Sequence, residues 1–277
     1  MKTRIISAAI AIVIAVIVLL LHDTFVFNLV IGLISALAIA EIFKATKHLK
    51  FTIPSVMCCA YAFIDSFIGV FHRHGWLTFF TNRLYFGALV LAMCVFYLKN
   101  YEKFKYKSLF FMLGVAVLIP YSFGTLLNMS MIPGSRGVYM IVITLCAAWL
   151  ADSGAYFAGT FFGKRKLCPE ISPKKTVEGL IGGVISNGVL MVVITLVFDL
   201  ATDTFEPKYF MLFIAGMAAA LVGLIGDLTA SEIKRQCGIK DYGNIMPGHG
   251  GVMDRFDSVL LVAPFMYYLF IQGALLK

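Results

Sequence analysis

The chain has 277 residues, of which 60% are hydrophobic and 14% are charged. Soluble domains contain about 45–50% apolar and about 25% charged residues. The apolar residues here also form long unbroken runs, which excludes an ordinary soluble fold. The formal net charge of +8 comes from basic residues in short segments between these runs. No basic helix with interleaved aromatic residues is present, so we expect no nucleic-acid partner and assign the charge to membrane topology and anionic headgroups.

Nine apolar runs approach or reach the length of about 20 residues that a membrane-spanning helix needs. They are residues 4–21, 25–42, 52–71, 84–98, 109–127, 137–161, 177–198, 209–227 and 258–275. The first run has Lys2 and Arg4 at its start but precedes no small-residue cleavage site, so we interpret it as a retained helix and not as a signal peptide. The sequence therefore predicts an all-α, polytopic integral membrane protein with about nine transmembrane helices.

The basic residues indicate how these helices are oriented. With the N-terminus in the cytoplasm and the runs alternating in direction, 18 of the 23 lysines and arginines face the cytoplasm. That excess is the pattern of the positive-inside rule. One run more or fewer in the first half would reverse the orientation there. We expect a multi-pass protein of the cell (inner) membrane, with the N-terminus and the polar loops 162–176 and 228–257 in the cytoplasm.

The acidic residues divide the chain into two parts. Only four of the 15 Asp and Glu residues precede residue 150, and the other eleven lie between residues 152 and 257. Membrane topology does not require carboxylates, so the second half needs them for another purpose. We expect residues 1–136 to supply N-terminal helices for anchoring and for dimer contacts. Residues 137–277 are then the catalytic transmembrane region.

Four of these acids are candidates for binding a ligand, and three of them, Asp227, Asp254 and Asp257, are candidates for binding a metal ion. Asp152 and Asp227 stand near the ends of apolar runs, where acids usually face a polar cavity. Asp254 and Asp257 are three residues apart and share one face if the last helix begins near them. Carboxylates suit Mg²⁺, whose coordination is completed by water and substrate phosphates. The alternative is a helix-end acid, solvated by headgroup water or stabilised by the helix dipole.

Cations and glycines accompany the acids. Phosphoryl-type transfer needs cations to neutralise phosphate oxygens and carboxylates to hold a metal ion. Residues 247–251 contain three glycines, which allow close backbone approach to a ligand and an anion-binding nest. His249 within this segment either donates to a phosphate or shapes the loop. Gly179, Gly182 and Gly183 favour close helix packing.

The second polar loop resembles the signature of the phosphatidate cytidylyltransferase (CDP-diglyceride synthetase) family. The matching residues are Ser231, Lys234, Arg235, Lys240, Asp241, Gly243, Pro247, His249, Gly250, Gly251, Asp254, Arg255 and Asp257. Met246 stands where the family has Ile, Leu or Phe. Residues 152–156 and 172–179 resemble two further motifs of this family, an Asp-Ser/Thr-x-Ala-Tyr segment and a Ser-Pro-Lys-Lys-Thr-x-Glu-Gly segment.

The resemblance implies a membrane-bound nucleotidyltransferase of phospholipid biosynthesis. In such an enzyme the phosphate of phosphatidate attacks the α-phosphorus of CTP, giving CDP-diacylglycerol and pyrophosphate. The resemblance also implies an all-helical membrane fold, a requirement for Mg²⁺ and a homodimer. A second cation, monovalent or divalent, is compatible with it.

On this basis we assign roles to individual residues. The expected metal ligands are Asp227 and Asp254. The expected catalytic residues are Lys234, Arg235, Lys240, Asp241, His249, Arg255 and Asp257. The expected substrate-binding residues are Asp152, Ser172, Lys174, Lys175, Glu178, Ser231, Gly250 and Gly251.

Two other functions are compatible with parts of the sequence. A related transferase would accept a prenol phosphate or another lipid in place of phosphatidate. A secondary transporter would explain many spans and acids, but it predicts paired broken helices in mid-membrane, whereas the polar residues here gather at the cytoplasmic ends.

Overall fold

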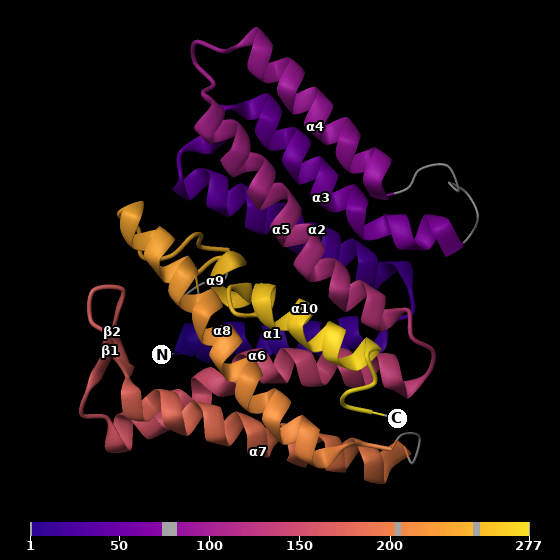
Figure 1. The fold of residues 1–277 in the computed structure, drawn as a ribbon, viewed down its shortest axis with the longest axis vertical. Helices are drawn as coiled ribbons and strands as arrows, with labels where there is room; N and C mark the ends of the chain where they lie inside the picture. The colour runs from indigo at the N-terminus through magenta and orange to yellow at the C-terminus, as the bar shows by residue number, and fades with distance from the viewer. Residues whose placement is uncertain (1, 74–81, 203–205, 246–249, 277) are drawn as a thin grey trace. The chain divides into compact units, whose positions relative to one another are not determined.

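The computed structural model describes the backbone of residues 2–73, 82–202, 206–245 and 250–276, and it is largely helical (Figure 1). The helices and strands, in chain order, are α1 (Lys2–Leu20), α2 (Phe25–Ala45), the 3-10 helix η1 (His48–Lys50), α3 (Thr52–Arg73), α4 (Asn82–Lys99), α5 (Tyr106–Ser130), α6 (Ser135–Phe162), β1 (Lys166–Cys168), β2 (Ser172–Thr176), α7 (Val177–Thr202), α8 (Tyr209–Gln236), α9 (Met253–Phe256) and α10 (Val259–Ile271).

Each of the nine predicted apolar runs corresponds to a helix, so the all-α polytopic fold is confirmed. Within the described ranges, six helices are long and apolar enough to cross a membrane, namely α2, α3, α5, α6, α7 and α8. The apolar parts of α1 and α4 are shorter. Helix α10 has 13 residues, which at 1.5 Å per residue is about 20 Å, short of a hydrocarbon core of about 30 Å. The number of nine spans therefore stays a prediction.

The chain forms two compact units. The first comprises residues 1–128 and 239–255, and the second comprises residues 129–238 and 256–277. The predicted division at residue 136 falls close to the first boundary, but it did not anticipate that residues 239–255 fold with the N-terminal helices. The separate roles that we assigned to the two halves stay predictions.

In the first unit, α2 packs along α3, and α3 packs against α4 (Figure 1). Its core is made of large apolar side chains that are fully buried, among them Ile39, Phe43, Met93, Phe104 and Met112. The thiol of Cys58 on α3 donates to the carbonyl oxygen of Met112 on α5. These contacts make the N-terminal helices a packed body that can support the loop at residues 239–255.

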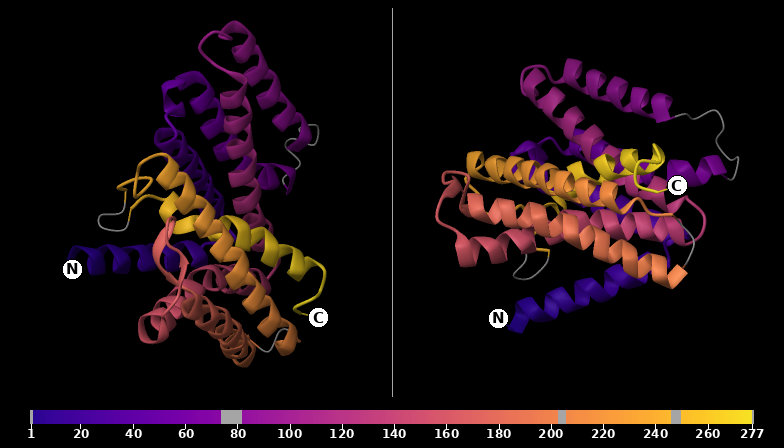
Figure 2. Two further views of the ribbon diagram at one scale, coloured as in Figure 1. Left: turned by 60° about the vertical axis from the view of Figure 1, so that its left-hand side comes forward. Right: turned by 60° about the horizontal axis from the view of Figure 1, so that its bottom comes forward.

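In the second unit, α6 and α7 lie side by side and are joined by the antiparallel hairpin of β1 and β2 (Figures 1 and 2). Glycines allow this approach: a Cβ atom on Gly183 would lie 2.8 Å from the carbonyl oxygen of Ala151, and one on Gly179 would lie 2.8 Å from that of Ala155. The prediction of close packing through these glycines is confirmed. Helix α8 packs on α7 and α6, and α10 packs on α6 and α8.

A buried amide fixes the same three helices together. The side chain of Asn187 on α7 donates to the carbonyl oxygens of Ala147 on α6, at 3.0 Å, and Gly216 on α8, at 2.8 Å. Asn187 is fully buried, so the two donated bonds offset the cost of burying its amide N–H groups. These bonds define how α6, α7 and α8 are set against one another beneath the hairpin.

The structure corrects three expectations about the polar loops. The predicted loop 228–257 begins later, because α8 continues to Gln236 through good helix formers until Gly238, whose φ is +68°. The predicted loop 162–176 contains the β-hairpin. Asp254 and Asp257 do not share a helix face, since α9 ends at Phe256 and a turn separates it from α10.

Candidate active site

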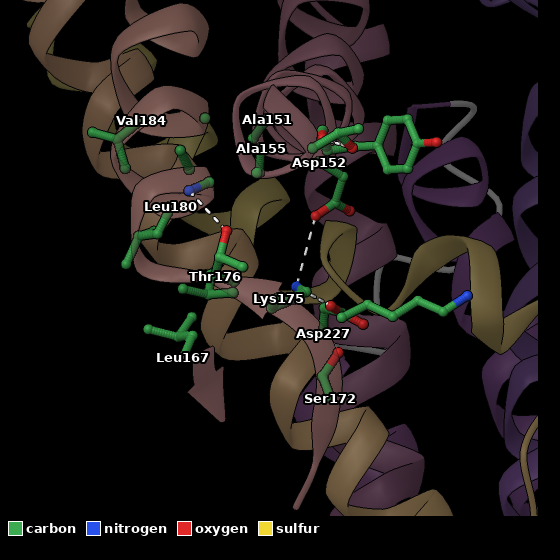
Figure 3. Close-up of a pocket in the computed structure, with 18 of the residues that line it drawn as sticks. Ala151, Asp152, Ala155, Leu167, Ser172, Lys175, Thr176, Leu180, Val184 and Asp227 are labelled. Carbon is green, nitrogen blue, oxygen red and sulfur yellow. Dashed lines mark hydrogen bonds and ion pairs between the residues drawn. The ribbon is translucent and has the colours of Figure 1, made fainter. Parts of the chain in front are cut away.

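A pocket of about 510 Å³ opens in the second unit between α6, the hairpin, α7 and α8 (Figure 3). One part of its lining is apolar, with Leu180, Val184 and Leu224 from α7 and α8. The other part is polar and charged. It includes Asp152, Lys166, Ser172, Lys174, Lys175 and Asp227. The pocket is therefore amphipathic, and it contains five of the residues that the sequence analysis selected.

An ammonium group lies between two carboxylates at the polar end of this pocket. Lys175 on β2 forms an ion pair and hydrogen bond with Asp227 on α8, and its Nζ lies 3.8 Å from Oδ1 of Asp152 on α6 (Figure 3). The side chains of Lys175 and Asp227 are 24% and 20% exposed, whereas that of Asp152 is 55% exposed. Three elements that are far apart in the sequence thus converge on one positive charge.

A third carboxylate approaches from the turn before α10. Asp257 is buried, and this burial together with the Asp227 carboxylate raises its pKa to about 7, while the buried Lys234 ammonium acts in the opposite direction. Gly226 permits the approach, because a Cβ atom there would lie 2.7 Å from the backbone oxygen of Asp257. The second unit therefore gathers the carboxylates of Asp152, Asp227 and Asp257 with two lysines.

Three other predicted site residues, Ser231, Arg235 and Glu178, make hydrogen bonds within and between the elements around the pocket. Ser231 Oγ donates to Asp227 Oδ1 at 3.4 Å, from one turn further along α8. Arg235 Nε donates to the carbonyl oxygen of Ile171 at 3.3 Å, which ties the end of α8 to the hairpin. The carboxylate of Glu178 accepts from the backbone N–H groups of residues 164 and 165, at 3.0 Å and 3.1 Å. Glu178 thus positions the chain that enters the hairpin, and it is not part of the pocket lining.

The remaining predicted residues belong to the first unit. Asp254 is buried, and its Oδ2 accepts from the backbone N–H groups of Tyr242, at 2.7 Å, and Gly251, at 3.0 Å. Gly250 adopts a φ of +88°, a conformation that glycine tolerates. Lys240, Asp241 and Arg255 are exposed. His249 lies outside the described residues. The expected metal ligands Asp227 and Asp254 belong to different units, so their pairing stays a prediction.

Sequence reasoning missed Glu41 on α2. Its carboxylate is buried and accepts from the backbone N–H groups of Val252, at 3.1 Å, and Met253, at 2.8 Å. One signal was available, because Glu41 is among the few acids in the first half and stands within an apolar run. An acid in that setting usually has a specific partner, but the sequence does not say which.

The donor chemistry of the second unit fits a magnesium ion. Within the described ranges, no group of three or more His, Cys, Asp or Glu side chains is arranged to hold a metal ion by itself. Magnesium typically uses one or two protein carboxylates and fills its octahedral shell with water and substrate phosphate oxygens. Asp227 and Asp152 already bind a positive charge, the Lys175 ammonium. The residues are therefore suited to a cation that is shared with a phosphorylated substrate.

Comparison with known proteins identifies the family. The sequence model described as the cytidylyltransferase family matches residues 2–272. A Haemophilus influenzae protein named phosphatidate cytidylyltransferase is 32% identical over 289 aligned residues, which cover 98% of each chain. A protein of the same name from Bacillus subtilis is 47% identical over 48% of this chain and 48% of its own length. Another, from Rickettsia bellii, is 36% identical over 66% of this chain and 79% of its own length. The chain belongs to the cytidylyltransferase family.

Proposed function

We propose that this protein is a CTP:phosphatidate cytidylyltransferase, which transfers CMP from CTP to phosphatidate and so makes CDP-diacylglycerol and pyrophosphate. One observation carries the proposal beyond family membership: the pocket of the second unit has a polar end with three lysines and two carboxylates, and an apolar wall (Figure 3). A phosphomonoester joined to two acyl chains presents the complementary surfaces. The relatives' shared name supports the same substrate.

The chain's own residues bind the lipid phosphate. Lys174, Lys175 and Ser172 all line the polar end of the pocket, so they are the candidates to contact the phosphate group. Lys175 would exchange its carboxylate partners for the phosphate oxygens as the lipid enters. Leu180 and Val184 on α7 would contact the glycerol and the first part of the acyl chains.

The reaction needs alignment more than proton transfer. A phosphate oxygen forms a bond to the α-phosphorus of CTP, the bond from that phosphorus to the β-phosphate oxygen breaks, and pyrophosphate leaves. The attacking phosphate is already ionised at neutral pH, so no strong general base is required. Lys234, Arg235, Lys240 and Arg255 would bind the triphosphate, because cations stabilise the charge on its oxygens during in-line displacement.

We propose Mg²⁺ as the cofactor, with Asp227 and Asp254 as its leading ligands and Asp257 and Asp241 as the next candidates. When bound, the ion neutralises triphosphate charge and orients the displacement. A second cation, monovalent or divalent, is a further proposal that rests on the family resemblance.

The orientation in the membrane follows from the substrates. CTP is a polyanion confined to water, and the basic residues cluster at the same helix ends as the carboxylates. We therefore propose that the N-terminus and the polar ends of α6 and α8 face the cytoplasm, consistent with the positive-inside rule. We also propose a homodimer, which the family resemblance implies.

A panel of lipids tests the substrate. The detergent-purified protein would receive CTP, Mg²⁺ and one of phosphatidate, a polyprenyl phosphate, diacylglycerol or no lipid, and pyrophosphate release would be measured. We expect release with phosphatidate and none with diacylglycerol, which lacks the attacking phosphate. Faster release with the polyprenyl phosphate would assign the protein to a different lipid. Release without any lipid would show hydrolysis in place of transfer.

A further inference from the structure

We infer that Glu41 is a positioning residue: from the N-terminal helices, it holds the glycine loop at residues 250–254 in its folded form. Its significance for turnover rests on the proposed function, because that loop supplies Asp254 and the backbone of Gly250 and Gly251. The effect on the loop itself is independent of any activity.

The contacts of Glu41 are directed at the backbone of that loop. Its two carboxylate oxygens accept separately, Oε1 from the N–H of Val252 at 3.1 Å and Oε2 from the N–H of Met253 at 2.8 Å. The side chain is only 6% exposed. A buried bond to a charged acceptor is stronger than a neutral one, and an unmatched backbone N–H in this position would be costly.

Two glycines, Gly251 in the loop and Gly243 before it, leave room for the same carboxylate. A Cβ atom on Gly251 or on Gly243 would collide with the Glu41 side chain. Gly250 needs glycine for another reason, its φ of +88°, whereas no positive φ occurs at Gly251 or Gly243. The absence of a side chain at these two positions is therefore explained by the space that Glu41 occupies.

Glu41 and Asp254 together satisfy the loop's backbone. Asp254 accepts from the N–H of Tyr242 and of Gly251, and Glu41 accepts from the next two N–H groups along the chain. Three consecutive N–H groups, those of residues 251–253, thus point at carboxylates of one unit. Loss of the Glu41 acceptor would release two of them and loosen the segment in which Asp254 is held. The N-terminal helices would therefore support the loop that carries the proposed site residues Asp254, Gly250 and Gly251.

The test compares Glu41→Gln with Ser35→Ala, measured on the full protein in detergent. The amide of Gln has nearly the shape of the carboxylate but only one acceptor oxygen. Ser35 is equally buried on α2 and bonds to the carbonyl of Ile31 in its own helix, so its loss disturbs α2 without touching the loop. Hydrogen exchange without substrates gives the first readout. We expect faster exchange at residues 250–254 in Glu41→Gln and unchanged exchange there in Ser35→Ala.

Kinetics give the second readout. Loss of one bond to a charged acceptor predicts a fall of about 10- to 100-fold in kcat/KM for CTP. The KM for phosphatidate should stay within about twofold of wild type, because its proposed pocket lies in the other unit. Unchanged loop exchange in Glu41→Gln overturns the inference. If the variants show the expected exchange but even the wild type has no cytidylyltransferase activity, the proposed function is refuted and the loop assignment stands.

A variant on the loop side covers the case in which Glu41→Gln does not fold. Gly251→Ala keeps the carboxylate and adds the colliding Cβ, so it should raise exchange at the same residues. Where both single variants fold, the double variant should be little worse than either alone, because both changes break one contact. Fully additive effects, or a Gly251→Ala protein that behaves like wild type, contradict the inference.

Discussion

The ion pair at the polar end of the pocket allows a quantitative prediction. Lys175→Met removes the ammonium and keeps a long apolar stem, which leaves the carboxylates of Asp227 and Asp152 facing each other. In the wild type, the Lys175 ammonium lies 3.8 Å from the Asp152 carboxylate. At an effective dielectric constant near 20, the Coulomb attraction of this ion pair is about 4 kcal/mol before the cost of desolvation is subtracted. Asp152 is more than half exposed, so water largely screens its attraction to Lys175.

The pair with Asp227 therefore carries most of the effect. Removing one partner of a buried pair costs about 3–5 kcal/mol, and Lys175 and Asp227 are mostly but not fully buried. We expect Lys175→Met to lower the free energy of unfolding by about 2 kcal/mol and the apparent Tm by about 4–8 °C. Asp227→Asn should cost less, about 1 kcal/mol or under, because Lys175 keeps Asp152 as a partner.

The double variant distinguishes this explanation from a general loss of packing. With both charges removed, Lys175→Met/Asp227→Asn should regain most of the stability that Lys175→Met alone has lost. Activity should not return, since both residues are proposed to act in the reaction. The measurements are thermal unfolding in detergent and CDP-diacylglycerol formation. Additive losses of stability in the double variant would refute the reasoning, as would a Lys175→Met protein with wild-type Tm and activity.

Three further predictions concern other parts of the two units. Gly183→Ala places a Cβ 2.8 Å from the carbonyl oxygen of Ala151, so the helices must separate, and we expect a loss of about 1–3 kcal/mol in thermal unfolding; wild-type Tm would contradict the close packing. Asp254→Asn can still accept both loop bonds through its amide oxygen, so we expect unchanged hydrogen exchange in the loop but a fall of at least about 100-fold in turnover; retained turnover would remove Asp254 from the metal site. Removal of divalent ions with a chelator should abolish activity and added Mg²⁺ should restore it, whereas full activity in excess chelator would exclude the proposed cofactor.

The helices and the polar cluster were predictable from local patterns. The nine apolar runs locate helices α1 to α8 and α10, because burial in a bilayer imposes one simple composition on each run. The glycines of α7 were correctly interpreted as packing residues, since a missing side chain has few other uses in an apolar helix. The co-location of Asp152, Lys175 and Asp227 was also expected, because the predicted topology puts the ends of two apolar runs and the loop at Lys175 on one side of the membrane. In the structure, Asp152 and Asp227 lie within α6 and α8, and Lys175 lies on β2.

What the sequence could not supply was the partner of each polar group. The apolar run predicts a helix that ends at residue 227, but the helix-forming residues after it continue α8 to Gln236. Ser231 and Lys234 therefore lie on successive turns after Asp227. Glu178 was expected at the lipid phosphate and instead accepts from two backbone N–H groups. Glu41 meets residues more than 200 positions away. Backbone groups leave no signal in the sequence, so carboxylates that bind them cannot be told from those that bind ligands.

The position of a label in the product tests the central claim most directly. CTP labelled at the α-phosphorus and CTP labelled at the γ-phosphorus would each be incubated with the purified protein, phosphatidate and Mg²⁺, and the lipid would then be extracted. We predict that the α-label enters the lipid and that the γ-label stays in water as pyrophosphate, in equal amounts. A γ-label found in the lipid, or an α-label that remains wholly in water, would contradict nucleotidyl transfer to phosphatidate.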